Sequence, residues 1–492
     1  MIDPSRILVA CQGANREPFR TEMQYLFKTL NHFGGSLSLA QKIACFTEPV
    51  DSDLIQSLVG MGVRIKITEE LGSKSPHSNK IQMLSLCEEE DFDYLVALDT
   101  DIVVAGDFSK FMRNDAIGAK PVDQDPLDLD TWKSLFAHYG LQLPQERYKT
   151  SFHFSDTIPY FNSGVILVPK KYVDVLYQKW KFFVAKLEEE YENLPTISQH
   201  TFFTDQFAFT LALASANIPH FALPLEMNFP THSPIHENLN PEVMKPYLIH
   251  YHHNFSNGNI AHCSYDNINS ILDGINLVLS SKDKTTKYQN TVNTRFYNNS
   301  FDNLEFWQNR YTQNPTLGSG IGSREIHLQY KRSLMEKIWN QYTPQSVLDV
   351  GCGDIEVVKE LPFQNYTGVD LSPHVVSENK IKKPEWNFIS GNFIEIAYGT
   401  NPKADLVMCF DVLIHQHDYK VYEEFVKCLI NATNKVGMIS SFEWFPRPQY
   451  RSEITAYHEP ITVTLEKFGL KNVKLVGVYR DTCIIMFEKN SK

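Results

Sequence analysis

Short apolar runs alternate with stretches of helical spacing along the first half of the chain. The apolar runs that predict strands are residues 6–11, 44–46 with their flanks, 63–67 and 94–98. Helical spacing covers residues 19–33 and 51–60, and a further helical stretch opens at Ser78. Continuous apolar runs of this length are typical of strands that are buried on both faces. Their alternation with helices predicts an α/β layer around a mostly parallel sheet.

The same alternation continues to about residue 255, with one interruption. Residues 159–168 and the apolar start of 247–254 predict strands, residues 170–191 predict a long helix, and Thr204 opens another helix. Residues 121–155 are polar and acidic, and they are rich in proline and aromatic residues. Because loops of that length are usually functional, we expect an irregular insertion that covers a ligand site.

A second α/β pattern follows a polar middle segment. Residues 268–279 have helical spacing, and the Ser/Lys/Thr-rich run 280–287 predicts a linker with a domain boundary between residues 285 and 295. In the second half, the expected strands are residues 346–350, 366–370 and 436–442, with a hairpin at 473–487 and a helical segment at 356–361. A further strand is expected within 404–415, with His415 at its carboxyl end. We therefore expect an α/β domain at 1–255, a helical and linker segment at 256–299, and a second α/β domain at 300–492.

Composition narrows the class of protein. A chain of 492 residues with 42% hydrophobic and 21% charged residues is ordinary globular protein of two or three domains. The net charge of -12 argues against a nucleic-acid partner, which usually requires a basic surface. No apolar run has the length of a membrane span, and no signal region opens the chain. The 8 cysteines are scattered without a CxxC pair, so we expect a reduced, cytoplasmic protein.

The strand at 94–98 runs directly into Asp99-Thr100-Asp101. Two carboxylates at such close spacing repel each other unless a cation bridges them, and Mg²⁺ and Mn²⁺ prefer oxygen ligands. The alternative is a solvated turn with two acids. Histidines at 250, 252 and 253 cluster at the end of the strand that opens 247–254, and a neutral imidazole can complete a metal site. The spacing alone leaves His250 and His252 as competing ligands.

Three further polar residues are candidate ligand contacts, each with a structural alternative. Lys80 can hold a phosphate or be a surface charge. Asn162 can bind a sugar hydroxyl while Gly164 lets a ligand approach the strand, or the two can form a tight turn. Asp205 can be a site residue or only the first-turn acid of a helix.

The order of these pieces resembles the GT-A-fold glycosyltransferases, most closely the retaining glycogenin/galactosyltransferase type. The matching pieces are Asn79-Lys80, LDTD at 98–101, FNSGV at 161–165, Asp205-Gln206 and IHYH at 249–252. The resemblance spans residues 1 to about 255. It implies a retaining hexosyltransferase in which Asp99, Asp101 and His250 bind Mn²⁺ or Mg²⁺. It also implies that Asn162, Asp205 and Gln206 contact the donor sugar.

In the second half, the strand in SVLDVGCG at 346–353 ends in a glycine turn, and the next strand ends at Asp370. Glycine permits a sharp turn close to a ligand. An acid about 20 residues downstream is the spacing of a ribose-binding carboxylate. The alternative is an ordinary αβ turn with a capping Asp. The dinucleotide pattern GxGxxG is absent, which disfavours NAD.

This stretch resembles the first motif of class I S-adenosylmethionine-dependent methyltransferases. WQNRY at 307–311 and LGSGIGS at 317–323 resemble the lead segment of one such group. The resemblance, over residues 300 to 490, implies the following roles: Asp349, Gly351 and Gly353 surround the methionine part, Asp370 binds the ribose, Asn392 lies beside the adenine, and Asp411 belongs to the fourth motif.

His415 is the candidate base for an acceptor hydroxyl, with His417 and Asp411 as alternatives, and Glu443, Trp444 and Arg447 are candidate acceptor contacts.

Together, these signatures suggest a bifunctional enzyme of glycan or polysaccharide biosynthesis. It would transfer a sugar from a nucleotide-sugar donor to a glycan or glycolipid acceptor with a divalent metal, and it would O-methylate a sugar hydroxyl with S-adenosylmethionine. One alternative is a methyltransferase whose N-terminal domain binds a glycan or nucleotide-sugar without turnover. Another is a nucleic-acid or protein methyltransferase with a targeting domain, which the acidic balance disfavours.

Overall fold

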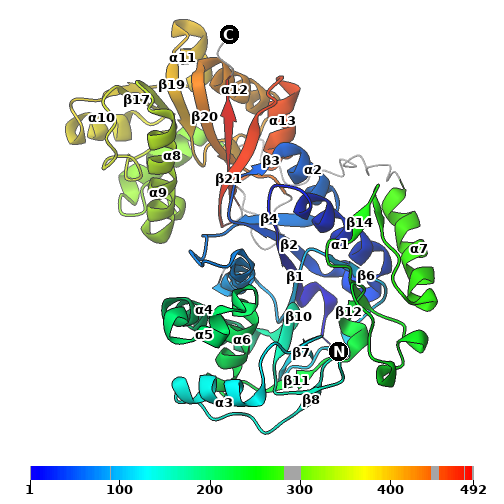
Figure 1. The fold of residues 1–492 in the computed structure, drawn as a ribbon. Helices are drawn as coiled ribbons and strands as arrows, with labels where there is room; N and C mark the ends of the chain where they lie inside the picture. Colours follow the sequence, from blue (N-terminus) through cyan, green and yellow to red (C-terminus); the bar gives the residue numbers. More distant parts are fainter. Residues whose placement is uncertain (1, 89, 282–300, 445–453, 481, 490–492) are drawn as a thin grey trace. The chain divides into compact units, whose positions relative to one another are not determined.

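The structure, a computed structural model, describes residues 2–88, 90–281, 301–444, 454–480 and 482–489. The chain separates into two compact units. The N-terminal unit comprises residues 1–48 and 57–287, and the C-terminal unit comprises residues 49–56 and 288–492. Each unit is built on its own central sheet (Figure 1).

A seven-stranded sheet in the order β11-β7-β10-β5-β1-β2-β4 is the centre of the N-terminal unit. Its strands are β1 (Ile7–Gln12), β2 (Gln41–Phe46), β4 (Val63–Ile67), β5 (Tyr94–Leu98), β7 (Ile117–Pro121), β10 (Phe161–Pro169) and β11 (His220–Ala222). β1 lies between β5 and β2 and is parallel to both, whereas β10 is antiparallel to β5. The carboxyl ends of β1, β2 and β5 therefore meet at one edge, where ligands bind in α/β sheets.

Helices cover both faces of this sheet. They are α1 (Phe19–Phe33), α3 (Leu129–His138), α4 (Lys170–Glu190), α5 (Pro195–Ser198), α6 (Thr204–Ser215), α7 (Asp266–Ser280) and the 3₁₀ segment η3 (Pro76–Glu88), while α2 (Ser52–Gly60) spans the division between the units. Leu8 of β1 packs in one core with Trp180 of α4 and Phe207 of α6. Figure 1 draws the helices α4 and α6 side by side. Ile7 and Val9 point to the opposite face and are also buried. The continuous apolar run of β1 is thus explained by burial on both faces.

A small sheet, in the order β12-β13-β6, extends the ligand edge of the N-terminal unit. It consists of β6 (Ile102–Val104), β12 (Phe229–Pro230) and β13 (Leu248–His250), and two short ribbons pair β8 (Tyr148–Lys149) with β9 (Asp156–Thr157) and β14 (Phe255–Ser256) with β15 (Asn259–Ile260). β13 is antiparallel to β6 with His250 opposite Ile102. This register places a residue from late in the chain beside the segment that follows β5.

One expectation for the N-terminal unit is wrong. The segment 121–155 is not wholly irregular, since it contains α3. Asp128 caps the start of this helix, and Trp132, Leu135 and Phe136 face the core at helical spacing. The apolar start of 247–254 forms β13 as expected, and the strand ends at His250, because His252 and His253 adopt positive φ angles that a strand does not permit. The helix expected at 268–279 is confirmed as part of α7.

An eight-stranded sheet in the order β18-β17-β16-β19-β20-β22-β21-β3 is the centre of the C-terminal unit. Its strands are β3 (Val50–Asp51), β16 (Val347–Val350), β17 (Tyr366–Asp370), β18 (Asn387–Ser390), β19 (Ala404–Cys409), β20 (Thr433–Ser441), β21 (Val473–Tyr479) and β22 (Thr482–Glu488). The strands from β18 to β20 are parallel, and β22 is antiparallel to β20 and β21. The hairpin expected at 473–487 is confirmed.

The helices of the C-terminal unit are α8 (Asn303–Gln313), α9 (Glu325–Tyr342), α10 (Pro373–Lys382), α11 (Phe393–Thr400), α12 (Tyr419–Ala432) and α13 (Ile461–Lys467). The helical segment expected at 356–361 is wrong, because these residues form turns. Ile355 has a φ of 59°, and Pro362 disfavours a helical conformation at the residue before it. Together they confine the segment to a single turn.

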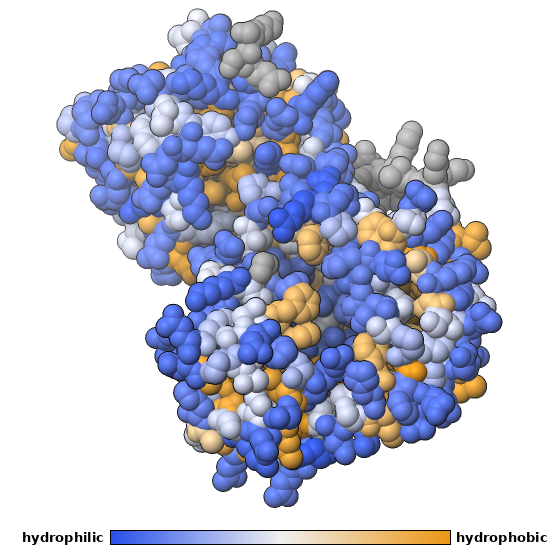
Figure 2. All heavy atoms as spheres, viewed as in Figure 1, coloured by the Kyte–Doolittle hydropathy of each residue, from blue (hydrophilic) through white to orange (hydrophobic). Residues whose placement is uncertain are grey.

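Some predictions fall on residues that the structure does not describe. The boundary expected at 285–295 and Arg447 lie outside the described residues, as does nearly all of the linker expected at 280–287. Among the helices of the described part of the chain, none combines the length and the apolar character that crossing a membrane requires. The face shown in Figure 2 is mostly hydrophilic, with apolar residues scattered over it.

Candidate functional site

Three side chains at the ligand edge of the N-terminal unit lie within reach of a single metal ion. Asp99 and Asp101 follow β5, and β13 brings His250 beside them. One potential ligand atom from each residue lies within 4.8 Å of the other two. His250 Nε2 is 3.0 Å from Asp101 Oδ1. Carboxylate oxygens and an imidazole nitrogen suit Mn²⁺ or Mg²⁺, so these residues fit the ion that the sequence predicts.

Neighbouring amides fix the orientation of the His250 ring. Asn228 donates its amide to Asn162 Oδ1 at 3.0 Å, which turns Asn228 Oδ1 toward His250 Nδ1, also at 3.0 Å. Nδ1 therefore donates to Asn228, and Nε2 is left to face Asp101. Burial lowers the pKa of His250, but the charge of Asp101 outweighs burial and raises that pKa overall. Burial raises the pKa of Asp101, but the interaction with His250 outweighs burial and lowers that pKa overall.

Lys80 and Asp205 extend this cluster into the protein. Lys80 Nζ is 2.6 Å from Asp99 Oδ1 and 3.7 Å from Asp205 Oδ2. Ser163 donates a hydrogen bond of 2.6 Å to Asp205 Oδ2. The side chain of Lys80 is 12% exposed and Asp205 is buried, so neither is merely a surface charge or a solvated first-turn acid. The lysine compensates two carboxylates where a diphosphate would add further negative charge.

β10 places Asn162 and Gly164 against the same cluster. Asn162 Oδ1 accepts the amide N–H of Gly164 at 2.8 Å. A Cβ at Gly164 would lie 3.0 Å from Asp99 Oδ2 and 3.0 Å from His250 Cε1. Glycine is therefore required here so that the strand can approach two candidate metal ligands.

Apart from Gly164 and Asn228, these residues line one cavity of about 810 Å³, a volume within the usual range for small-molecule sites. The loop after β1 and the first turn of α6 contribute Gly13 and Gln206, and Phe202 stands at the cavity with 61% of its surface exposed. Of the sequence-predicted residues, the cavity is lined by Lys80, Asp99, Asp101, Asn162, Asp205, Gln206 and His250, as well as His252. The cavity combines the candidate metal ligands with amide and aromatic side chains.

His252 is oriented differently from His250. Its ring stacks on that of His250 with centroids 3.8 Å apart, and its Nδ1 is 2.9 Å from the His250 carbonyl. Burial lowers the pKa of His252 to about 2. Among the described residues, the three-residue ligand cluster contains His250 and does not contain His252.

One residue beside this cluster, Glu22, escaped the sequence reasoning. Glu22 of α1 accepts a hydrogen bond from Thr100 and pairs with His253. That hydrogen bond raises the pKa of His253 to about 9. Glu22 looks like an ordinary first-turn acid of a helix in the sequence, since its partners lie 78 and 231 residues away.

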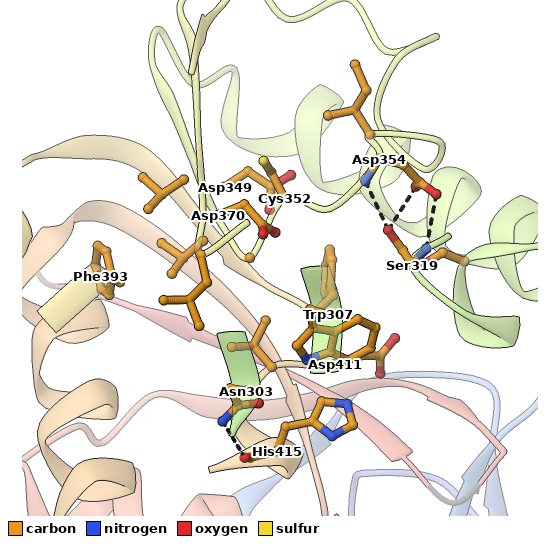
Figure 3. A pocket seen from close by; sticks show the side chains of 18 of the residues that line it. Asn303, Trp307, Ser319, Asp349, Cys352, Asp354, Asp370, Phe393, Asp411 and His415 are labelled. Carbon is orange, nitrogen blue, oxygen red and sulfur yellow. Dashed lines mark hydrogen bonds between the residues drawn. The ribbon is translucent and has the colours of Figure 1, made fainter. Parts of the chain in front are cut away.

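The C-terminal unit contains a second cavity, at the carboxyl ends of β16, β17 and β19 (Figure 3). Six of the seven sequence-predicted residues line it: Asp349, Gly351, Asp370, Asn392, Asp411 and His415. Gly353 does not line it and instead donates its N–H to Asp370 at 3.0 Å. Asn303 and Trp307 of α8 close the cavity beside His415 (Figure 3).

Asp370 is the anchor of the glycine turn. Its carboxylate accepts the N–H groups of Gly353 and of Ser372, the latter at 2.9 Å. Gly351 and Gly353 have φ angles of 75° and 54°, which favour glycine. Burial raises the pKa of Asp370 to about 6. Each carboxylate oxygen keeps a lone pair that can accept a ribose hydroxyl, so the residues present fit an adenosyl cofactor.

Asp349 and Asn392 flank this anchor. Asp349 accepts a hydrogen bond of 2.7 Å from Tyr366, and burial raises its pKa to about 7. Asn392 caps α11 through its Oδ1, which accepts the N–H of Ile394. The capping oxygen points away from the amide NH₂, so a donor remains for a ligand.

Asp411 is held by a buried cation that the sequence did not reveal. Lys331 of α9 is 1% exposed and its Nζ lies 2.6 Å from Asp411 Oδ2. Tyr479 donates to the other oxygen. Burial favours the neutral acid, but the charge of Lys331 outweighs burial and lowers the pKa of Asp411. Because Asp411 already pairs with this lysine, it is a weaker candidate base than His415.

His415 holds one tautomer. Its Nδ1 lies 2.7 Å from the Ile454 carbonyl, which can only accept, so Nδ1 carries the proton. Nε2 then has a free lone pair when the ring is neutral. Burial lowers the pKa of His415, which keeps the ring neutral near pH 7. Trp307 packs edge-on against the ring, with centroids 5.1 Å apart.

Three further candidates from the sequence do not line this cavity. Glu443 does not contact the acceptor end of the cavity, because it is fully buried and accepts hydrogen bonds from Thr462. Trp444, which is also buried, is not among the residues that line the cavity, and neither is His417. The Glu443 carboxylate thus accepts hydrogen bonds from α13 rather than from a ligand.

Two family models match the chain. Residues 29–217 match the model of the Rhodobacterales glycosyltransferase domain. Residues 348–432 match a model described as a methyltransferase domain. No curated protein matches the chain.

Several solved structures are similar at low identity. The galactosyltransferase LgtC, solved with donor and acceptor sugar analogues, is 14% identical over 56% of this chain and 98% of its own, with a TM-score of 0.37. The magnesium protoporphyrin IX methyltransferase ChlM from Synechocystis, solved with bound SAM, is 17% identical over 39% of this chain and 100% of its own, with a TM-score of 0.30. The N-methyltransferase NodS from Bradyrhizobium japonicum is 12% identical over 39% and 100%, with a TM-score of 0.33.

Proposed function

Since the chain carries a glycosyltransferase domain followed by a methyltransferase domain, we propose that it is a bifunctional enzyme of glycan assembly. The first domain transfers a sugar from a nucleotide-sugar to a glycan or glycolipid acceptor in a metal-dependent reaction. The second methylates a sugar hydroxyl with S-adenosylmethionine. We retain the division into 1–255, 256–299 and 300–492, although residues up to 280 form α7, which is counted with the N-terminal unit.

The observation that carries the first activity is the Asp99, Asp101 and His250 cluster within an 810 Å³ cavity. A divalent ion bound there neutralises charge on a departing nucleoside diphosphate. Lys80 offers a cation at the same place. Asn162, Asp205 and Gln206 lie where they can orient the donor sugar. Retention of the anomeric configuration rests on the resemblance of the N-terminal half to the retaining glycogenin/galactosyltransferase type.

The second activity rests on the Asp370 anchor and the His415 tautomer. S-adenosylmethionine supplies an activated methyl group when it is bound. Asp370 binds the ribose hydroxyls, Asn392 orients the adenine, and Asp349 and Gly351 adjoin the methionine part. His415 Nε2 accepts the proton of the acceptor hydroxyl as that oxygen attacks the methyl group. Trp307 provides an apolar face on which a sugar ring can stack.

The cellular location is proposed on cysteine chemistry. The described cysteines are free and mostly buried. Such thiols suit a reducing compartment, so we propose the cytoplasm.

A panel of nucleotide-sugars, incubated with and without Mn²⁺, tests the first activity through release of the nucleotide. Asp99→Ala and Asp101→Ala should abolish Mn²⁺-dependent release, while Asp130→Ala, which removes an exposed acid paired with Lys133, should not. Release that is equal in all four proteins would refute the metal assignment. No release with any donor would favour a binding domain without turnover.

The same incubation with methyl-labelled S-adenosylmethionine tests the second activity. We expect the label in the glycan fraction. Label in RNA or protein would instead support a different methyltransferase.

A further inference from the structure

Glu22 is a buried carboxylate whose two partners both belong to the segments that supply the candidate metal ligands. It lies in the first turn of α1 and has no exposed surface. Its Oε2 accepts the hydroxyl of Thr100 at 2.8 Å. Its Oε1 lies 2.5 Å from Nδ1 of His253. Glu22 itself is not among the residues that line the cavity.

Thr100 connects Glu22 to the two aspartates. It stands between Asp99 and Asp101 in the chain, and only 4% of it is exposed. The hydrogen bond to Glu22 points the Thr100 side chain into the protein. This hydrogen bond therefore fixes the short turn that carries Asp99, Thr100 and Asp101, all of which line the cavity.

His253 connects Glu22 to the histidine ligand. It lies three residues after His250 and has a φ of 58°, so the chain turns back at this point. Tyr251 donates its N–H to the Asp101 carbonyl at 3.1 Å, which joins this turn to the aspartate segment. Glu22 therefore links the segment that carries Asp99 and Asp101 to the segment that carries His250.

A fully buried carboxylate is costly unless its charge is compensated. Glu188 shows the ordinary structural solution in the same unit, since it accepts bonds from Ser73, Lys74 and Ser75, which lie in one loop. The partners of Glu22 lie instead in two segments, 78 and 231 residues away. Metal ligands need to be held within about 0.5 Å of their productive geometry, and supporting side chains do this.

We propose that Glu22 is a positioning residue of the divalent-cation site, which fixes the Asp99–Asp101 segment and the His250–His253 segment at the spacing that one ion requires. Glu22 acts through Thr100 and His253 and does not touch the ion. The inference rests on the proposed metal site of the N-terminal unit.

Binding of Mn²⁺ alone to the full chain tests this inference, with free Mn²⁺ followed by electron paramagnetic resonance. Glu22→Gln keeps the size of the side chain but loses the charge and one acceptor. We expect its Mn²⁺ affinity to fall about 10- to 100-fold, as for other residues that support metal ligands. Glu188→Gln is the matched control, because it alters a buried acid that does not line the cavity and does not contact the segments of the candidate metal ligands, and it should keep the affinity of the original chain.

A pair of variants at Thr100 tests the same link without touching the buried charge. Thr100→Val has nearly the same shape but lacks the hydroxyl, so it should lose affinity as Glu22→Gln does. Thr100→Ser keeps the hydroxyl and should restore most of the affinity. A purely structural role would not separate serine from valine in this way. This pair also decides the matter if Glu22→Gln does not fold.

The outcomes separate this inference from the proposed function. If Asp101→Ala abolishes Mn²⁺ binding while Glu22→Gln and Thr100→Val bind like the original chain, only the role of Glu22 is refuted. Equal losses in Glu22→Gln and Glu188→Gln would also refute it. If Asp101→Ala binds Mn²⁺ as well as the original chain does, the metal site itself is wrong.

Discussion

The tautomer of His415 is the residue-scale feature on which methyl transfer depends most. The Ile454 carbonyl accepts the proton on Nδ1, so only Nε2 can take a proton from an acceptor. The sequence identified His415 by its place after β19, but it could not reveal this tautomer. The hydrogen bond comes from a residue 39 positions later, and such long-range contacts leave no local pattern.

Replacing His415 should slow methyl transfer without releasing the cofactor. We expect His415→Ala to lower kcat by about 10²- to 10⁴-fold, the usual range for a lost general base. The affinity for S-adenosylhomocysteine, measured by calorimetry, should change little. His417→Ala is the control, because His417 does not line the cavity. An unchanged kcat in His415→Ala would assign the base elsewhere.

The Asp370 carboxylate should make cofactor binding depend on pH. Burial raises its pKa to about 6, so the group is charged above pH 6 and neutral below it. A neutral acid is a poorer acceptor for ribose hydroxyls, and affinity for S-adenosylhomocysteine should therefore fall as the pH drops from 7 to 5. Calorimetry at several pH values measures this.

Asp370→Asn is the control for that pH dependence. It should bind weakly at every pH between 5 and 7, with no inflection near pH 6. An inflection that survives in this variant would show that another group titrates.

At the scale of the element, β10 shows how strand position serves the site. The apolar run at 159–168 predicted this strand, but its value lies in Gly164, where the backbone passes two metal ligands. Spacing alone could not separate that use from a tight turn. Conversely, the sequence pattern did not reveal α3, which lies in a polar, proline-rich segment. Only three residues of this helix face the core, and most of the residues around it are typical of loops. Local pattern thus located the strands well and the insertion poorly.

Adding one methyl group at Gly164 should damage the metal site. In Gly164→Ala, the new Cβ would meet Asp99 and His250 at 3.0 Å, so both ligands must shift. We expect Mn²⁺ affinity to fall by about tenfold or more. Gly274→Ala in α7 is the control, since nothing lies within 4 Å of its added Cβ. Equal affinities in the two variants would contradict the close approach.

The contact between β20 and α13 should weaken as the pH rises. Glu443, which follows β20, has its pKa raised by burial to about 8, against 4.5 when exposed. Between these values the native state binds more protons than the unfolded state, so stability falls with rising pH. The slope approaches about 1.4 kcal/mol per pH unit. Hydrogen exchange of the β20 and α13 amides at pH 5.5 and 7.5 measures it.

Glu443→Gln removes this titration. The stability that hydrogen exchange measures in this variant should differ little between pH 5.5 and pH 7.5. Relative to the original chain, the variant should therefore be more stable at pH 7.5 than at pH 5.5. The same pH dependence in both proteins would show that Glu443 is not its source.

At the scale of the whole molecule, each unit contains its own cavity. The sequence predicted both α/β domains, since each repeats the alternation of buried strands and helices, and the family models match one domain in each half. The sequence could not predict which further side chains fix the orientation of the candidate site residues. Glu22 and Lys331 act across 78 and 80 residues, and neither belongs to a recognisable motif.

The two chemistries should be separable by mutation. Asp101→Ala should abolish sugar transfer yet still methylate an acceptor that already carries the added sugar. Asp370→Asn should do the reverse. Chromatography of the labelled products distinguishes the two. Loss of both activities in either variant would mean that the sites do not work independently.

The central claim is that Asp99, Asp101 and His250 together bind one divalent cation against the diphosphate of a nucleotide-sugar. Anomalous diffraction at the manganese edge, from crystals grown with Mn²⁺ and UDP or GDP, tests it most directly. We predict one strong peak within bonding distance of all three side chains and of the diphosphate. A nucleotide bound in the cavity with no peak among these residues would contradict the claim.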